Sequence, residues 1–368
     1  VTAIEALRRG RKAIAIDVDP IATFITRLTL EPISIDMFQE AFQEIEEKVK
    51  ERIQGFYLME CPNCGTQALE VYVIWSDVFH CGKCNQNLVF TDLKIKKENY
   101  FCPCGAPIDI NNFVSEEPIE VGYECEHCLQ KVKKKVRFLI KKEILHENKK
   151  RFDEFNRMDV PYWVPKDVKL EYSNGKPFQE GTHQQKRNTI ESLFTKRNLI
   201  ALSILWNEIE KIKDADIKDL MKLVFTSNLH NVSKLNPVHQ PRWKKGQHPS
   251  TSWIVHRYWV PPLRVELPIW FYFKERFEHI LKGKQESNES IFYREAKTFD
   301  DLKKDTNCLI FTKSALSLLE TFATIPKNSV DYVFTDPPYG GSIQYMELSF
   351  LWISWLRGEN NDPRFDML

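Results

Sequence analysis

The chain has 368 residues, more than one average domain, and its 42% hydrophobic and 28% charged residues are typical of a globular protein. Its 52 basic and 51 acidic side chains leave a formal net charge of +1, so nucleic acid can bind only through local patches. No apolar run approaches the ~18 residues of a membrane helix, and no signal peptide is evident. We therefore expect a cytoplasmic protein without membrane contact. A reducing compartment favours metal binding over disulfides for its nine cysteines.

Alternating helices and strands are predicted at the start of the chain, as in a parallel α/β sheet. Thr2 to Arg9 has helical spacing, and Gly10 is placed to end that helix. Lys12 to Asp17 is a short apolar run of strand type that ends on a carboxylate. A second helix is predicted from Asp19-Pro20, with Asp19 as its cap and proline at the tolerated first position.

A longer helix is predicted from Asp36 to Gly55. Asp36 and Gln39 fit a capping box. Five apolar residues recur at helical spacing: Phe38, Phe42, Ile45, Val49 and Ile53. Because Val1 is not a methionine and the first helix has no cap before it, we expect the chain to be part of a longer protein.

Four closely spaced cysteine pairs occur between residues 56 and 145. They predict two four-cysteine zinc ribbons, formed by Cys61, Cys64, Cys81 and Cys84 and by Cys102, Cys104, Cys125 and Cys128. In this grouping 16 residues separate the first two pairs and 20 the second two, although Cys102-Pro-Cys104 is tighter than usual. The alternatives are disulfides or a redox pair. A closed site of four cysteines has no open coordination position, so both Zn²⁺ ions are expected to be structural. Cys308 stands alone and is predicted to be a core residue.

The region from 146 to 300 is more varied. Residues 146–190 are polar and contain proline and glycine, which predicts an irregular connector. Residues 191–230 are predicted to be helical, and 237–273 are rich in Pro, Trp, Tyr, Arg and His. A helix over 274–281 is expected to be followed by a polar linker near 283–290.

The motif Asp336-Pro337-Pro338-Tyr339 ends an apolar segment, Ser329 to Asp336, that is predicted to be a strand; a helix rich in Trp and Leu follows. Such residues suit the methylation of an exocyclic amine, whose lone pair is delocalised into the base. Asp336 and a proline carbonyl can accept the two amine hydrogens and aim the nitrogen at an electrophilic methyl group. Tyr339 offers a face for stacking a flipped base. The alternative is an ordinary turn after a strand.

The Asp336 motif resembles that of amino-methyltransferases that use S-adenosylmethionine, and residues 2–20 look like the stretch after that family's Gly-rich cofactor loop. Together with the cysteine pairs, the segments Trp259–Leu267 and Gly340–Ser349 resemble the adenine-specific DNA methylases that contain zinc ribbons. The resemblance implies that Asp17 binds the ribose hydroxyls of the cofactor. It also implies a Gly-rich loop before Val1 and further strands and helices after Leu368, so the sheet in this chain is expected to be incomplete.

This resemblance predicts a Rossmann-like α/β methyltransferase with four parts: residues 1–55 and 301–368 form its sheet domain, 56–145 the zinc ribbons, and 146–300 a connector and target-recognition insertion. The expected reaction is methylation of adenine N6 in DNA. Open alternatives are methylation of cytosine N4, an RNA base or a protein amide, or a non-catalytic zinc-ribbon protein that binds nucleic acid.

Two basic segments are candidates for nucleic-acid contact. Lys131 to Arg137, with Lys141 and Lys142, can contact phosphates, or can be a solvated charged face. The stretch from Arg242 to Trp259 interleaves cations with aromatics, which suits flipped or single-stranded bases unless the aromatics belong to the core.

Overall fold

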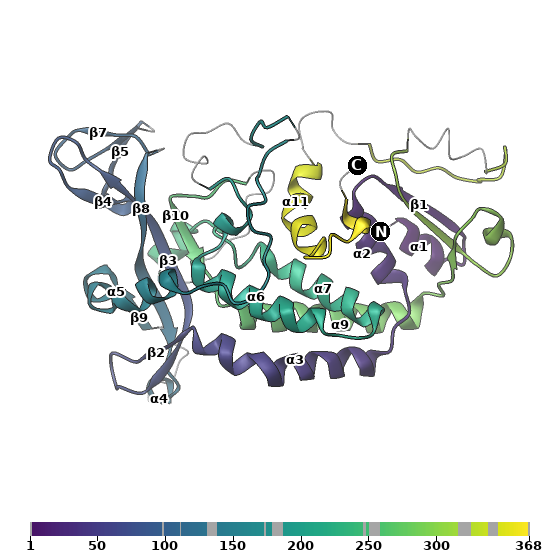
Figure 1. Cartoon of the computed structure of the whole chain (residues 1–368), viewed down its shortest axis with the longest axis horizontal. Helices are drawn as coiled ribbons and strands as arrows, with labels where there is room; N and C mark the ends of the chain where they lie inside the picture. The colour runs from purple at the N-terminus through teal and green to yellow at the C-terminus, as the bar shows by residue number, and fades with distance from the viewer. Residues whose placement is uncertain are drawn as a thin grey trace. The chain divides into compact units, whose positions relative to one another are not determined.

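A computed structural model describes residues 2–97, 99–110, 112–130, 138–172, 174–178, 187–245, 248–249, 258–315, 325–337 and 345–366. The chain divides into two compact units. The first, called here the parallel unit, comprises Val1–Glu47, Glu208–Ser227 and Lys274–Leu368. The second, called the ladder unit, comprises Lys48–Asn207 and Asn228–Phe273. The described residues form a mixed α/β structure with three separate sheets (Figure 1).

The parallel unit contains a three-stranded sheet in the order β1-β12-β11, with both pairings parallel. Register runs from Ala13 opposite Cys308 to Asp17 opposite Thr312, so Asp17 and Thr312 end neighbouring strands at the same edge. The strands are β1 (Ala13–Asp17), β11 (Glu295–Ala296) and β12 (Cys308–Thr312). The remaining elements that lie in this unit are α1 (Thr2–Arg8), α2 (Pro20–Leu30), η4 (Asp300–Lys303), α11 (Tyr345–Leu356) and η6 (Pro363–Phe365).

The predicted elements at the start of the chain are confirmed. Gly10 follows α1 with φ +67°, a left-handed conformation that glycine adopts without steric cost. Asp19 caps α2, because its Oδ1 accepts a hydrogen bond from the backbone N of Ile21 at 2.8 Å. The strand and both helices thus begin and end close to where the sequence placed them.

The long helix α3 (Ile35–Gly55) is also confirmed, with a different cap. All five residues of its apolar stripe are at most 4% exposed. The capping box at Asp36 is wrong: Ser34 precedes the helix, and its Oγ accepts from the backbone N of Met37 at 3.3 Å. A serine one position before the first turn competes effectively for this role, because its short side chain reaches the free backbone N–H groups.

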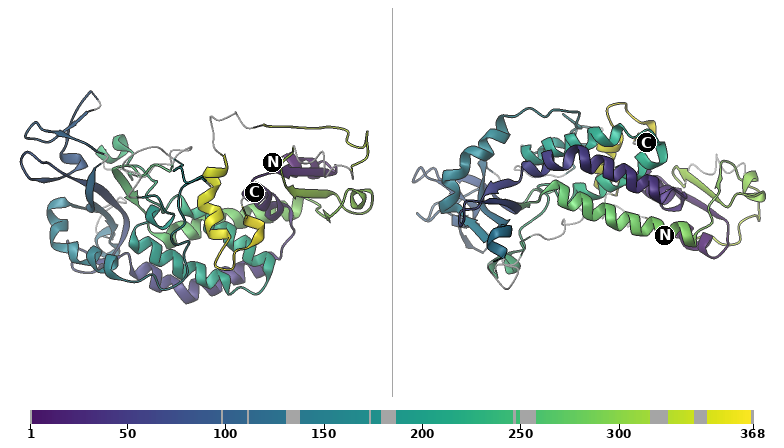
Figure 2. Two further views of the ribbon diagram at one scale, coloured as in Figure 1. Left: turned by 45° about the horizontal axis from the view of Figure 1, so that its top comes forward. Right: turned by 90° about the horizontal axis from the view of Figure 1, so that it is seen from below.

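Helix α9 (Ile269–Ser290) contains the helix expected over 274–281, but the linker predicted near 283–290 is helical too. Its polar sequence is held by buried contacts. Lys284 Nζ donates to the carbonyl oxygens of Leu28 at 2.9 Å and Thr29 at 3.3 Å, and thus satisfies the end of α2. Phe277 stacks on Phe42 with ring centroids 3.9 Å apart, where α9 and α3 run side by side (Figure 2).

The end of the chain agrees with the sequence in one element and not in another. Helix α11 forms as expected and buries Leu351 and Trp355, whose indole lies 5.0 Å from the ring of Phe225. The strand expected over Ser329 to Asp336 is absent from this described segment, and Tyr332 is 79% exposed. An apolar run becomes a strand only when a neighbouring backbone pairs with it, and none of the described strands does so.

The ladder unit is built on an antiparallel sheet in the order β10-β3-β8-β9. Its centre is the pairing of β3 (Gln67–His80) with β8 (Phe113–Glu124), two long strands that Figure 1 shows side by side. The other strands of this sheet are β2 (Leu58–Glu60), β4 (Asn87–Val89), β9 (Phe138–Lys141) and β10 (Leu263–Glu266). Residues of β-branched and aromatic type dominate β3, which explains its strand structure.

A small third sheet, in the order β5-β6-β7, lies in the chain between the two long strands. Its strands are β5 (Lys94–Lys96), β6 (Asn99–Phe101) and β7 (Pro107–Ile108). Besides α9, the described helices that begin in the ladder unit are η1 (Phe90–Asp92), α4 (Glu126–Leu129), α5 (Lys142–Arg157), η3 (Glu191–Leu193), α6 (Lys196–Glu210) and α8 (Gln240–Lys244). The helices η3, α6 and α7 (Ala215–Leu229) confirm the helical structure expected over 191–230.

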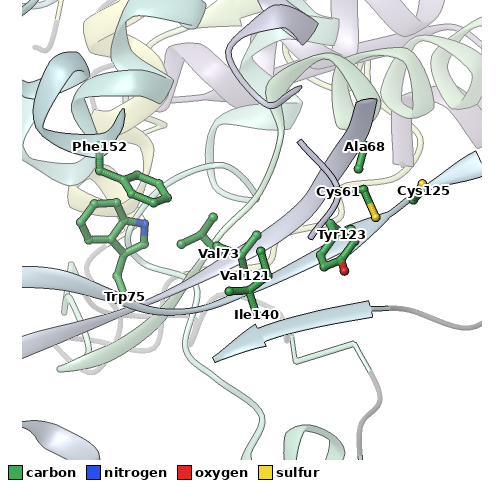
Figure 3. Close-up of a cluster of buried hydrophobic side chains, with 9 residues drawn as sticks. All are labelled: Cys61, Ala68, Val73, Trp75, Val121, Tyr123, Cys125, Ile140 and Phe152. Carbon is green, nitrogen blue, oxygen red and sulfur yellow. The ribbon is translucent and has the colours of Figure 1, made fainter. Parts of the chain in front are cut away.

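The irregular connector predicted over 146–190 is wrong at its start, because α5 extends to Arg157. The reason is tertiary packing: Phe152 is buried against Trp75 of β3, with ring centroids 5.5 Å apart (Figure 3). None of the helices described is both long and apolar enough to cross a membrane.

Candidate metal centres and cofactor-binding edge

Four cysteines gather at one end of the β3–β8 ladder, and we call them the proximal cluster. Cys61 and Cys64 come before β3, and Cys125 and Cys128 come at the end of β8 and in α4. The Sγ atom of Cys64 lies 3.6 Å from that of Cys125, and the Sγ atoms of Cys61 and Cys128 are 3.8 Å apart.

The distal cluster lies at the opposite end of the same ladder. Cys81 and Cys84 follow β3, and Cys102 and Cys104 lie in the turn between β6 and β7. The Sγ atoms of Cys81 and Cys104 are 3.7 Å apart, and those of Cys84 and Cys102 are 3.5 Å apart.

The structure confirms that the eight cysteines form two clusters of four and corrects how they are grouped. The sequence paired Cys61 and Cys64 with Cys81 and Cys84, as two ribbons in series. In the structure the clusters are nested, with the first pair joined to the last pair and the two middle pairs joined together. The cause is the antiparallel pairing of two long strands, which brings the residues before β3 beside those after β8.

Each cluster has the geometry of a closed metal site. Zinc bound by four thiolates at about 2.3 Å places neighbouring sulfur atoms about 3.8 Å apart, close to the separations described above. These separations are far longer than the roughly 2.05 Å bond of a disulfide. Each cluster can therefore hold a metal ion, and its thiol donors fit zinc.

The turns that present these thiols share one backbone feature. The residue after the second cysteine of three pairs has a positive φ: Gly65 at +72°, Asn85 at +57° and Gly105 at +88°. This left-handed residue suits glycine or asparagine and lets backbone N–H groups point at sulfur. Hydrogen bonds, first from the side chain of Thr66, lower the pKa of Cys64 to about 5. Those from the backbone of Cys84 lower the pKa of Cys81 to about 6.

Hydrophobic side chains surround both clusters. Around the proximal cluster, Figure 3 shows Cys61 and Cys125 beside Ala68 and Tyr123. The distal cluster has a core of its own: Phe79, Cys81, Leu88, Leu93, Cys102, Ile108 and Phe113. Both clusters consist of cysteine alone among the described residues. His80, adjacent to Cys81, instead has its Nδ1 3.0 Å from Oδ1 of Asn87.

A separate candidate site lies at the carboxyl edge of the parallel strands, where open α/β sheets hold ligands. Asp17 ends β1 and is exposed, and its Oδ1 accepts a hydrogen bond from the backbone N of Asp19 at 2.9 Å. On the adjoining strand, the hydroxyl of Thr312 is 2.7 Å from that of Thr23. Asp17 is thus an exposed carboxylate at this edge.

Ser349 of α11 contacts the same edge, because its hydroxyl donates to Oδ2 of Asp19. Burial raises the pKa of Asp19, and the hydrogen bond from Ser349 opposes that rise. Asp19 therefore has two functions: it caps α2 through one oxygen and holds α11 through the other. The sequence gives no signal for this contact, since 330 positions separate the two residues.

The motif residues are placed only in part. Asp336 and Pro337 lie in the exposed segment before α11, and the contacts described do not bring Asp336 to Asp17. Pro338, Tyr339 and the run Lys131–Arg137 lie outside the described residues.

Two buried ion networks in the ladder unit were not anticipated from the sequence. Asp77 of β3 binds Arg187 and Arg264, and Glu116 of β8 also binds both arginines and Lys234.

In the second network Arg197 of α6 joins Glu70 to Glu266. The segment Trp259–Leu267, which supported the resemblance, thus supplies Arg264 and Glu266 to the core. Because these charges are paired and buried, we assign them a structural role.

Comparison of the chain with models of protein families, with curated proteins and with solved structures finds no significant match.

Proposed function

We propose that this chain is part of an S-adenosylmethionine-dependent methyltransferase that acts on adenine N6 in DNA and carries two structural zinc ions. The single observation that carries the proposal is the hydrogen bond from Ser349 to Asp19. It joins the helix that follows the Asp336 motif to the strand edge where Asp17 ends β1. The strand end that carries Asp17 and the helix that follows the Asp336 motif are thereby joined at one edge of the sheet, which supports the proposal.

The proposed division of labour follows from the chemistry of these side chains. S-adenosylmethionine would supply an electrophilic methyl group. Asp17, an exposed acceptor, would bind the ribose hydroxyls. Asp336 would accept one hydrogen of the adenine amine and a proline carbonyl the other, which localises the lone pair on nitrogen. Tyr339 would stack on the flipped base.

The two four-cysteine clusters would each hold one Zn²⁺ with no position open to substrate, so their part is structural. Each would fix one end of the β3–β8 ladder, where the local apolar core is small.

A second function is favoured by one observation. The segment Ser329–Pro337 is exposed and belongs to no strand, as expected for a protein in which the methylase fold is a scaffold and the zinc module binds nucleic acid without catalysis.

The two functions are separated by measuring N6-methyladenine in DNA from a host that lacks adenine methylation and expresses this protein. We expect methyladenine with the unaltered protein and none with Asp336→Ala. The matched control is Asp331→Ala, which removes a carboxylate from the same exposed segment and should leave methylation unchanged. A folded, zinc-loaded protein that produces no methyladenine would contradict the adenine assignment. DNA binding that persists in that protein would support the second function.

A further inference from the structure

The part of the chain around α8 has an unusual charge composition. No Asp or Glu occurs between Asp219 and Glu266, although 51 of the 368 residues are acidic. Within this stretch Arg242, Lys244 and Lys245 lie in and directly after α8, and all three are exposed. Among the residues that the structure describes, none forms an ion pair with these three side chains.

Helix α8 is anchored to the β3–β8 ladder through its only aromatic residue. The indole Nε1 of Trp243 donates to Oε1 of Glu120 on β8 at 3.0 Å, and the hydroxyl of Tyr72 on β3 donates to the same oxygen at 3.0 Å. The ring of His248 packs edge-on against Tyr72 at 5.2 Å. Trp243 is therefore committed to the ladder through its indole.

The backbone around α8 is held as well. His239 caps the helix, because its ring Nδ1 accepts a hydrogen bond from the backbone N of Arg242 at 3.2 Å. The backbone N of His239 donates to the carbonyl oxygen of Pro249 at 2.7 Å. Just before it, the backbone N of Val238 donates to Leu263 of β10 at 3.3 Å. A short helix that would be unstable alone is thus fixed on both sides.

Helical geometry then determines where the cations point. Successive residues turn by about 100°, so Arg242 and Lys244 each lie about 100° from Trp243, and Lys245 lies about 160° from it. With Trp243 directed at Glu120, Lys245 is directed away from the ladder, and Arg242 and Lys244 lie on the two flanks of the helix, so none of the three cations faces the ladder. This arrangement suits a phosphate-contacting surface, because phosphate contacts need exposed, positioned cations, and the carboxylate of Glu120 that anchors α8 is buried.

We infer that Arg242, Lys244 and Lys245 form a surface that binds the phosphate backbone of duplex DNA. The inference rests on the proposed function and extends it to the contact that holds the substrate. It also differs from the base-stacking role suggested by the sequence, since Trp243 is anchored to Glu120 and Tyr258 is 3% exposed.

The test measures the affinity of the zinc-loaded protein for a labelled duplex oligonucleotide by fluorescence anisotropy, over a series of salt concentrations. The triple variant Arg242→Gln, Lys244→Gln, Lys245→Gln is compared with a control triple, Lys213→Gln, Lys297→Gln, Lys303→Gln, which removes the same charge from exposed positions elsewhere. Each phosphate contact contributes about 0.9 to the slope of log affinity against log salt. We expect the α8 variant to lose about tenfold or more in affinity and up to about 2.7 in slope, and the control much less.

Trp243→Phe tests the anchoring step, because it keeps an aromatic ring and all charges and removes the N–H donor to Glu120 together with part of the indole. We expect weaker binding with a smaller change in salt slope than in the triple variant. Zinc content and circular dichroism verify that each variant is folded.

Equal affinities and slopes for the α8 and control triples would overturn the inference while leaving the methylation proposal intact. Unchanged affinity in Trp243→Phe would overturn the anchoring of α8. If the unaltered protein does not bind duplex DNA, both the inference and the DNA substrate of the proposed function are wrong, and the methyladenine measurement reports on the reaction separately.

Discussion

Cys308 differs from the other eight cysteines in its surroundings. It is fully buried on β12, beside Leu7, Ala13 and Tyr293, as the sequence predicted for a core residue. Burial raises the pKa of its thiol to about 12, so almost no reactive thiolate is present near neutral pH.

We therefore expect Cys308 to resist alkylation in the folded protein, even after chelation of metal, whereas Cys104, the exposed cluster cysteine, reacts once metal is removed. Peptide mass spectrometry after a timed exposure to iodoacetamide measures both sites. Equal labelling of Cys308 and Cys104 in the chelated protein would show that Cys308 is accessible.

Glu116 is the carboxylate that holds most of the first buried ion network together. Burial opposes its ionisation, but Arg264, Lys234 and Arg187 outweigh burial and hold the pKa of Glu116 well below its ordinary value. A lowered folded-state pKa stabilises the fold above the unfolded-state value of about 4.5, and this contribution is lost as the pH falls through the acid range.

Glu116→Gln should therefore reduce the free energy of unfolding at neutral pH by on the order of 3 kcal/mol, because it leaves two buried arginines to share Asp77 and removes the carboxylate that Lys234 binds. The difference from the unaltered protein should shrink as the pH falls below about 4.5. Urea unfolding at a series of pH values measures it, and Glu117→Gln, at the neighbouring half-buried position, is the matched control. A difference that is constant with pH would contradict the role of ionised Glu116.

At the scale of elements, the nested grouping of the cysteines predicts the zinc content of double cysteine variants, and a grouping in series predicts the opposite result. Cys64 and Cys128 belong to one cluster, and Cys64 and Cys84 to different ones. Cys64→Ser combined with Cys128→Ser should therefore lose one zinc ion per chain, and Cys64→Ser combined with Cys84→Ser should lose both. Metal content by inductively coupled plasma mass spectrometry distinguishes the two arrangements, because grouping in series gives the opposite stoichiometry for each pair.

The elements that the sequence predicted well are those determined by neighbours along the chain. The stripe from Phe38 to Ile53 and the cap at Asp19 each depend on contacts within a few positions, and both were confirmed. The ligand types were also foreseeable, because closely spaced cysteine pairs are a common metal-binding pattern.

The features that the sequence missed depend on distant partners. The spacing of the cysteine pairs favours ribbons in series, and only the antiparallel pairing of β3 with β8 brings the first pair beside the last. The polar residues 283–290 become helical because Lys284 reaches the end of α2. The contact between Ser349 and Asp19 likewise joins residues with no local relationship.

At the scale of the whole molecule, both metal clusters belong to the ladder unit and neither belongs to the parallel unit, among the residues described. Removing metal should therefore affect the two units differently. Hydrogen exchange followed by mass spectrometry, with and without a chelator, should show lost protection in β3 and β8 and little change in β1, β12 and α2.

Equal loss of protection in both units would mean that they unfold together and would contradict this independence. A protein in which Cys64, Cys84, Cys102 and Cys125 are all replaced by serine provides the same comparison without chelator, since it disables both clusters by substitution.

The nesting of the clusters also bears on how such a protein can change over evolutionary time. Phe79 and Phe113 are opposite one another in the ladder, and everything between them, including the distal cluster and its small core, forms one excursion of the chain. Because Phe79 and Phe113 are adjacent, a tight hairpin can replace the segment between them without altering the path of the chain elsewhere. This segment is therefore a natural place for gain, loss or exchange of sequence, whereas the proximal cluster, which joins the other ends of the two long strands, is not.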